Sequence, residues 1–163
     1  MLVVWDVDSG TPRKTIFNPH PEGVLALDIN EDGSLIVTLR DTRILFWLWE
    51  NNERGFELYS PEIPAKKTLT QTVFIPNSPQ AVSGTREGVI IVWDISLIME
   101  DYTQPEERRA IKTVNLMNNP NKIDQMKKTG ASTAITVLKI EGRFLVVGSS
   151  NGSVRFYDDQ YRI

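Results

Sequence analysis

A short template that ends in an aromatic residue recurs along the chain and constrains its fold more than any other feature. Its clearest copy is Glu87–Asp94, EGVIIVWD, in which a turn pair precedes four β-branched residues and then Trp-Asp. The turn pair can adopt the positive φ angles of a tight hairpin. The apolar run predicts a strand buried on both faces. The Trp adds a large apolar ring with one N–H that needs a partner.

Three other stretches are variants of this template. Residues 41–47 (DTRILFW) and 151–158 (NGSVRFYD) are complete copies, and residues 1–6 (MLVVWD) lack the turn. In the complete copies the turn residue stands six positions before the aromatic residue. Repetition at about 40–45 residues with a Trp-Asp ending is typical of four-stranded propeller blades. The sequence therefore predicts an all-β fold made of repeated blades.

The chain resembles the WD-repeat β-propeller family over nearly its whole length, and within that family it is similar to a ciliary branch. The segments that carry the resemblance are IFNPHPEGVLALDI, QTVFIPNSPQAVSGTREGVIIVWDI and AITVLKIEGRFLVVGSSNGSVRFYD. The resemblance implies a rigid sheet platform whose loops and rims hold protein partners.

The expected strands number two, four, four and three along the chain, with one of them over Val89–Ile95 and a turn expected over Asp8–Pro12. The corresponding segments are 1–19 (strands c and d of a first blade), 20–60 (a second blade), 66–117 (a third blade with long polar insertions) and 131–163 (strands a to c of a last blade). Propellers typically close with 4–8 blades. A chain that starts and stops within blades is expected to form an incomplete propeller, an open arc of about three to four blades. We expect the rest of a propeller, or a completing chain, to cover its ends.

The polar insertions are expected at Met99–Arg109 and Met117–Ser132. They explain why Tyr157 follows Trp93 by 64 residues, whereas Trp47 follows Trp5 by only 42.

WD-repeat proteins often carry a buried hydrogen-bond network of His, Ser or Thr, Asp and Trp inside a blade. The second blade offers His20, Asp41 and Trp47, but the residue four positions before Asp41 is Val37, so its hydroxyl is expected to be missing. We expect such networks to be structural, because a buried imidazole with hydrogen-bond partners is a satisfied core group. The full set of expected structural motif residues is Trp5, Asp6, His20, Asp41, Trp47, Ser83, Glu87, Trp93, Asp94, Asn151, Tyr157 and Asp158.

The stretch Asp28–Gly33 matches the opening of a calcium-binding EF-hand loop. The bidentate Glu required at the twelfth position is Leu39 instead, and the flanking residues are strand-like. We expect an ordinary hairpin turn and no calcium. The basic segments 108–112 and 122–128 raise the alternative of a calmodulin-binding helix. Pro120 and Gly130 bracket only about two helical turns, so a solvated loop is favoured.

Composition excludes several kinds of site. The sequence has no Cys and a single His, so disulfides, thiolate metal sites and multi-histidine metal sites are ruled out. No nucleophile has an evident base, and the carboxylate pairs lie in polar stretches. A net charge of −3 gives no reason to expect nucleic acid, and no apolar run reaches the length of a membrane span. We expect no catalytic, cofactor or metal site.

The expected function is that of a non-catalytic scaffold. The resemblance implies a cytoplasmic protein of the cilium or flagellum, part of the axonemal cytoskeleton. It further implies a place at the base of radial spoke 3, with spoke-base proteins, a calmodulin-containing complex and the doublet microtubule as partners. The alternative is an adaptor in another cytoplasmic assembly, such as a ubiquitin-ligase substrate receptor or a trafficking coat. A propeller enzyme is disfavoured, since no acid, base and nucleophile converge in the sequence.

Overall fold

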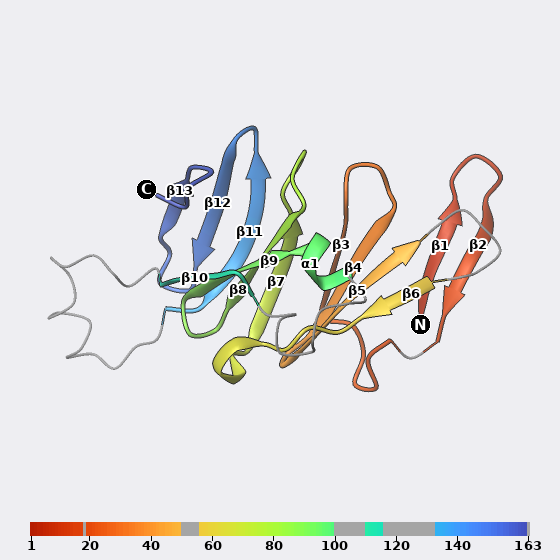
Figure 1. The fold of residues 1–163 in the computed structure, drawn as a ribbon, viewed down its shortest axis with the longest axis horizontal. Helices are drawn as coiled ribbons and strands as arrows, with labels where there is room; N and C mark the ends of the chain where they lie inside the picture. Colours follow the sequence, from red (N-terminus) through yellow and green to blue (C-terminus); the bar gives the residue numbers. More distant parts are fainter. Residues whose placement is uncertain (18, 50–55, 100–109, 116–132, 163) are drawn as a thin grey trace, which may run out of the picture.

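A computed structural model describes residues 1–17, 19–49, 56–99, 110–115 and 133–162. Within these residues the strands form four antiparallel sheets that stand side by side as an open arc (Figure 1). The expectation of an all-β, incomplete propeller is therefore confirmed. The first sheet pairs β1 (Leu2–Asp6) with β2 (Thr11–Ile16), and the other sheets have four, four and three strands.

Each larger sheet is a meander in which strands consecutive in sequence are hydrogen-bonded neighbours. The second sheet contains β3 (Ala26–Ile29), β4 (Leu35–Arg40), β5 (Arg43–Trp49) and β6 (Phe56–Tyr59). The third contains β7 (Leu69–Phe74), β8 (Gln80–Thr85), β9 (Val89–Asp94) and β10 (Lys112–Asn115). The last contains β11 (Ile135–Glu141), β12 (Phe144–Ser149) and β13 (Val154–Tyr157).

Two local expectations were wrong, and one further turn was not expected. The strand expected to run through Ile95 ends at Asp94, where the short helix α1 (Ile95–Met99) begins. The Asp94 carboxylate accepts hydrogen bonds from the Ser96 and Leu97 N–H groups, which satisfies helix-start donors. The turn expected at 8–12 is shorter, because β2 starts at Thr11. Pro12 lies opposite Trp5, beside a register shift in the strand pair. A proline, which has no N–H to donate, is tolerated in a strand at such an irregularity. A 3-10 turn, Pro64–Lys66, was not expected.

The organising template forms a strand buried on both faces, as its composition predicts. Every residue of β9 from Val89 to Trp93 is buried. The turn that precedes it places Gly88 at φ +71°, a region that L side chains rarely adopt. A Cβ on Gly88 would also lie 2.6 Å from the Thr133 carbonyl oxygen at the start of the next sheet. Gly88 therefore serves both the hairpin turn and the close approach of two sheets.

The main core fills the space between the second and third sheets. Phe46 from β5 makes edge-to-face contacts with Phe74 and Trp93, each with ring centroids 6.3 Å apart. Val37 and Ile91 add fully buried aliphatic side chains to the same cluster. Residues separated by nearly 50 positions thus share one layer, and this packing holds the two sheets together.

The third and fourth sheets also pack closely. A Cβ on Gly84 would lie 2.5 Å from Cγ2 of Ile135, so a larger residue at this point of β8 would force a neighbouring group to shift. Ile135, Leu138 and Val147 form a second core with Ile90 from β9.

The innermost strands of adjacent sheets are joined by side chains instead of a backbone ladder. The Asp28 carboxylate on β3 accepts a hydrogen bond of 2.9 Å from the Phe74 N–H on β7. The side-chain amide oxygen Oε1 of Gln71 on β7 accepts a hydrogen bond of 2.8 Å from the Leu138 N–H on β11. Each bond satisfies a main-chain donor that has no strand beside it in its own sheet. The same kind of link therefore fixes both sheet-to-sheet junctions.

The first sheet covers only part of the face of the second. Leu2, Val4 and Ile16 pack against buried side chains of the two middle strands, β4 and β5. On β3 the same face carries Leu27, which lies opposite Thr38, and Ile29, which lies opposite Ile36. These two side chains are 56% and 48% exposed, whereas Ile36 is 3% exposed. The β3 part of the face is therefore an uncovered apolar surface.

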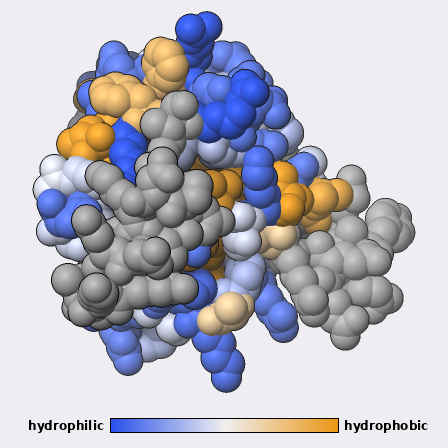
Figure 2. Space-filling view, turned by 90° about the vertical axis from the view of Figure 1, so that its left-hand side faces the viewer, coloured by the Kyte–Doolittle hydropathy of each residue, from blue (hydrophilic) through white to orange (hydrophobic). Residues whose placement is uncertain are grey.

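The last sheet is uncovered on its outer side. Val137, Val154 and Phe156 are each more than half exposed there. Figure 2 shows this side of the molecule, with hydrophobic residues at the surface among hydrophilic ones. Both ends of the arc therefore present apolar surface.

Candidate functional site

The second sheet contains a buried network centred on Thr38. Trp47 donates its indole N–H to the Thr38 hydroxyl over 2.9 Å, and Nε2 of His20 lies 3.1 Å from the same oxygen. All three side chains are buried. The expectation that this blade has no hydroxyl partner was wrong. Counting from Asp41 pointed to Val37, whereas the hydroxyl stands one residue later.

Strand register explains the displaced hydroxyl. In the third sheet, Trp93 lies opposite Ala81, and the hydroxyl of Ser83 stands two residues further along β8. In the second sheet, Trp47 lies opposite Ile36, and Thr38 again stands two residues further along. The β4–β5 turn is shorter than the β8–β9 turn, since Arg40 already pairs with Arg43. Counting from the tryptophan through the strand pairing would have found Thr38.

The third sheet has a second network that replaces histidine by threonine. Trp93 donates its indole N–H to the Ser83 hydroxyl over 2.8 Å, and the Thr72 hydroxyl lies 2.5 Å from the same oxygen. Thr72 is buried on β7 and was not identified from the sequence. The two networks supply internal partners for indole N–H groups that are shut off from water.

The turn carboxylates lie outside these networks. Asp41 forms ion pairs with Arg40 at 3.1 Å and Arg86 at 3.6 Å, and Glu87 accepts a hydrogen bond of 3.2 Å from the Thr68 N–H. Nδ1 of His20 has no hydrogen-bond partner among the described residues. The structure thus brings His20, Thr38 and Trp47 together, and it turns the carboxylates toward the connection between the second and third sheets.

The remaining motif residues have local roles. Asn151 accepts a hydrogen bond from the Ser153 N–H at 3.0 Å, within the turn before β13. Tyr157 is buried, and its hydroxyl has no partner among the described residues. Asp158 stabilises the turn after β13 by accepting from the Gln160 and Arg162 N–H groups.

At the opposite end of the arc, Trp5 is 58% exposed. The neighbouring Asp6 accepts hydrogen bonds from the Ser9 N–H and from Arg13, and these lower its pKa to about 2.

Histidine 20 is expected to make the stability of the fold depend on pH. Burial, with a smaller contribution from the charges of Arg43 and Arg40, lowers the pKa of His20 below 6.5. The neutral imidazole is therefore the form that the fold accepts. Its contribution to stability is complete above the unfolded pKa of about 6.5 and is lost as the pH falls through the lower folded pKa.

Thermal unfolding of the intact protein and of His20→Gln at neutral and mildly acidic pH measures this effect. The parent should lose stability on acidification, and the variant should lose less, since an amide does not titrate there. Equal losses in the two proteins would contradict the role of His20.

In the turn that resembles a calcium loop, side-chain oxygens already accept hydrogen bonds from main-chain N–H groups of the protein. Asp28 accepts the Phe74 N–H, Asn30 accepts the Leu35 N–H at 2.8 Å, and Asp32 accepts the Ser34 N–H at 2.8 Å. We expect no heat of calcium binding at micromolar affinity in calorimetric titration of the folded protein. A one-site isotherm that Asp28→Ala abolishes would overturn this prediction.

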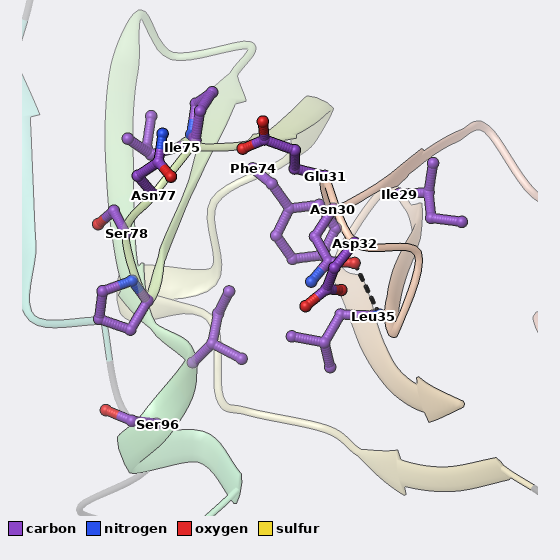
Figure 3. Close-up of a pocket in the computed structure, with 13 residues that line it drawn as sticks. Ile29, Asn30, Glu31, Asp32, Leu35, Phe74, Ile75, Asn77, Ser78 and Ser96 are labelled. Carbon is purple, nitrogen blue, oxygen red and sulfur yellow. Dashed lines mark hydrogen bonds between the residues drawn. The ribbon is translucent and has the colours of Figure 1, made fainter. Parts of the chain in front are cut away.

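An open groove lies between the second and third sheets, at the ends of their first hairpins. It has a volume of about 1070 Å³. Figure 3 shows the β3–β4 turn, with Asn30 and Asp32, on one side and the β7–β8 turn, with Asn77 and Ser78, on the other. Phe74 lies between the two turns. A second groove of about 540 Å³ lies between the third and fourth sheets and shares the β7–β8 turn.

In the described part of the chain, no three His, Asp or Glu side chains gather in a way that could hold a metal ion. Among those same residues no helix is long and apolar enough to cross a membrane. The basic segment expected at 122–128, with its calmodulin alternative, lies outside the described residues, as do most of the two polar insertions. The described chain provides closely packed sheets, buried polar networks and two inter-sheet grooves.

The chain is similar to WD-repeat proteins in the sequence of one segment, and its fold is similar to that of a solved structure. The family described as "WD domain, G-beta repeat" matches residues 10–47, which include β2 to β5 up to Trp47. The solved structure of U3-55K aligns with a TM-score of 0.63 over 96% of this chain and 42% of that chain, at 19% identity. That likeness supports the propeller fold alone.

The curated proteins similar to this chain share one name, Cilia- and flagella-associated protein 251. The protein from Tetrahymena thermophila is 45% identical over 219 aligned residues and matches 100% of this chain. Those from Chlamydomonas reinhardtii and Mus musculus are each 24% identical and match 100% and 97% of it. The chain spans 22%, 27% and 16% of these relatives. Because the 219-residue alignment exceeds the 163 residues of this chain, the Tetrahymena relative has internal residues without a counterpart here.

Proposed function

We propose that the chain is part of a non-catalytic scaffold of the cilium or flagellum that holds protein partners in a large complex. The observation that carries this proposal is that three relatives, from a ciliate, an alga and a mouse, match nearly all of this chain and are named for cilia and flagella. The packed cores between its sheets support the stiffness that a scaffold needs. The segments 1–19, 20–60, 66–117 and 131–163 are proposed as its blade units.

The finer proposal places the protein at the base of radial spoke 3, in the calmodulin- and spoke-associated complex. It rests on the resemblance to the ciliary branch of the WD-repeat family. In this position the propeller would bind spoke-base proteins and link them to the doublet microtubule. The two inter-sheet grooves and the uncovered sheet faces are the surfaces available for such contacts.

Axoneme fractionation tests the two levels of this proposal separately. The intact protein, carrying an epitope tag, is expressed in ciliated cells, and isolated cilia are extracted with detergent and then with salt. We expect the tagged protein to remain with the doublets after detergent, together with tubulin. Chemical cross-linking of these axonemes should then recover spoke-base proteins. Retention with cross-links to other axonemal complexes would refute the spoke position and keep the ciliary scaffold.

The alternative is an adaptor of another cytoplasmic assembly, such as a ubiquitin-ligase substrate receptor or a trafficking coat. In that case the tagged protein should be absent from cilia or leave them with detergent. An enzymatic role is the third possibility, and a screen of the intact protein for hydrolase activity tests it. We expect no activity above that of a heat-denatured sample.

A further inference from the structure

The larger groove is the open end of the core between the second and third sheets. Phe74 and Ile95 form part of its wall and belong to the buried core cluster, and Leu35 packs against that cluster. Pro79 adds a further apolar surface. The groove lining also includes the apolar residues Ile29, Ile75 and Pro76, some of which Figure 3 labels. An apolar side chain that entered from outside would continue a hydrophobic layer that already exists.

The rim of the groove is acidic. Glu31 and Asp32 stand together on the β3–β4 turn, and the described residues of the lining include no Lys, Arg or His. The hydrogen bonds from Ser34 lower the pKa of Asp32, which keeps this carboxylate ionised at neutral pH. Glu31 has no hydrogen-bond or ion-pair partner among the described residues. The two carboxylates therefore present negative charge beside an apolar floor.

The neighbouring groove differs in this respect. Its lining includes Arg143 as well as Asp158 and Asp159, and Asp158 already pairs with Arg162 at 2.9 Å. Its charges are therefore mixed and partly neutralised within the protein. Only the larger of these two grooves combines an apolar floor with an uncompensated acidic rim.

We propose that this groove binds an extended segment of a protein partner in which an apolar side chain stands next to Lys or Arg. The apolar side chain would fill the space over Phe74 and Leu35, and the basic side chain would lie beside Glu31 and Asp32. Asn77 and Ser78, on the opposite turn, offer an amide and a hydroxyl to the main chain of the segment. An acidic rim disfavours a phosphate-bearing ligand, so a peptide fits better than a nucleic acid or nucleotide. This inference deepens the proposed scaffold function by naming one partner surface.

Selection of random peptides displayed on phage against the intact protein tests the proposal. We expect the enriched sequences to share an apolar residue adjacent to Lys or Arg. Synthetic versions should bind in fluorescence anisotropy more weakly as salt is raised, because rim charges are screened by salt. Exchange of their basic residue for Glu should abolish most of the binding.

Variants of the groove locate the binding site. Glu31→Lys reverses the exposed rim charge and should weaken binding roughly three- to tenfold. Ser78→Trp should obstruct the groove from the opposite turn. Glu22→Lys is the matched control, because it makes the same charge change at an exposed residue outside the groove and should bind as the parent does. Thermal melting of each variant verifies that its fold is retained.

Three results would overturn the proposal: no enrichment above a surface without protein, enriched peptides with acidic flanks, or binding that Glu31→Lys and Glu22→Lys affect equally. The scaffold function has an independent readout in axonemal retention. If the peptides fail but the protein stays with the doublets, only the groove proposal falls. Loss of retention with intact peptide binding would instead refute the ciliary position.

Discussion

Replacement of Trp93 by Ala should destabilise the folded intact protein by about 3–5 kcal/mol, the cost typical of deleting a large buried aromatic side chain. Trp93 is fully buried, and its ring packs edge-to-face on Phe46 of the neighbouring sheet. Its removal would leave a cavity at the junction of two sheets and take away the indole donor to Ser83. Thermal and denaturant unfolding of parent and variant measure the loss.

Trp93→Phe separates packing from hydrogen bonding. It keeps most of the ring volume but cannot donate to Ser83, whose hydroxyl retains the contact with Thr72. We expect it to cost about 1–2 kcal/mol, clearly less than Trp93→Ala. An unchanged melting temperature for Trp93→Ala would refute the importance of its burial, and equal losses for both variants would assign the effect to the hydrogen bond.

Residues 1–163 expressed alone should aggregate or unfold without a sharp transition. Repeat units bury their faces against neighbours, and both ends of this arc present uncovered apolar surface. Leu27 on β3 and Phe156 on β13 are 56% and 54% exposed. In the part of the chain that the structure describes, no strand pairs with the other backbone edge of β1, and this edge offers a template for association with another strand. Light scattering and thermal unfolding of the isolated chain test this prediction.

A solubility variant provides the control for this experiment. Leu27→Lys combined with Phe156→Lys places charge on the two uncovered faces without touching the cores. If these faces drive association, the double variant should scatter less light than the parent. A parent that is a monodisperse 18.5 kDa monomer with one cooperative transition would show that the uncovered faces do not limit its stability.

Sequence reasoning captured the features that depend on neighbouring residues. The turn pair and apolar run of 87–94 predicted a buried strand after a tight turn, and Gly88 has the positive φ that such a turn needs. The spacing of the aromatic residues predicted repeated sheets. These features are local, because side-chain periodicity and turn chemistry act over a few residues.

Two predictions made from the sequence were wrong: the end of the strand that contains Trp93, and the absence of a hydroxyl partner for Trp47. The run of apolar residues suggested that the strand included Ile95, but the Asp94 carboxylate begins a helix there. Thr38 was missed because the family spacing was counted through a turn whose length varies. Register across the strand pair, and not distance along the chain, decides which hydroxyl meets the indole.

The sequence by itself determined the strands, the hairpin turns and the repeated blades, because each depends on residues close together in the chain. Only the tertiary structure decided that Asp28 bonds to Phe74 and Gln71 to Leu138, and that two hairpin turns enclose an acidic groove. The first contact joins residues that are 46 positions apart in the chain, and the second joins residues that are 67 positions apart. They depend on how far one sheet is displaced and turned against the next, and the packing of Phe46, Trp93 and Gly84 between the sheets sets that displacement.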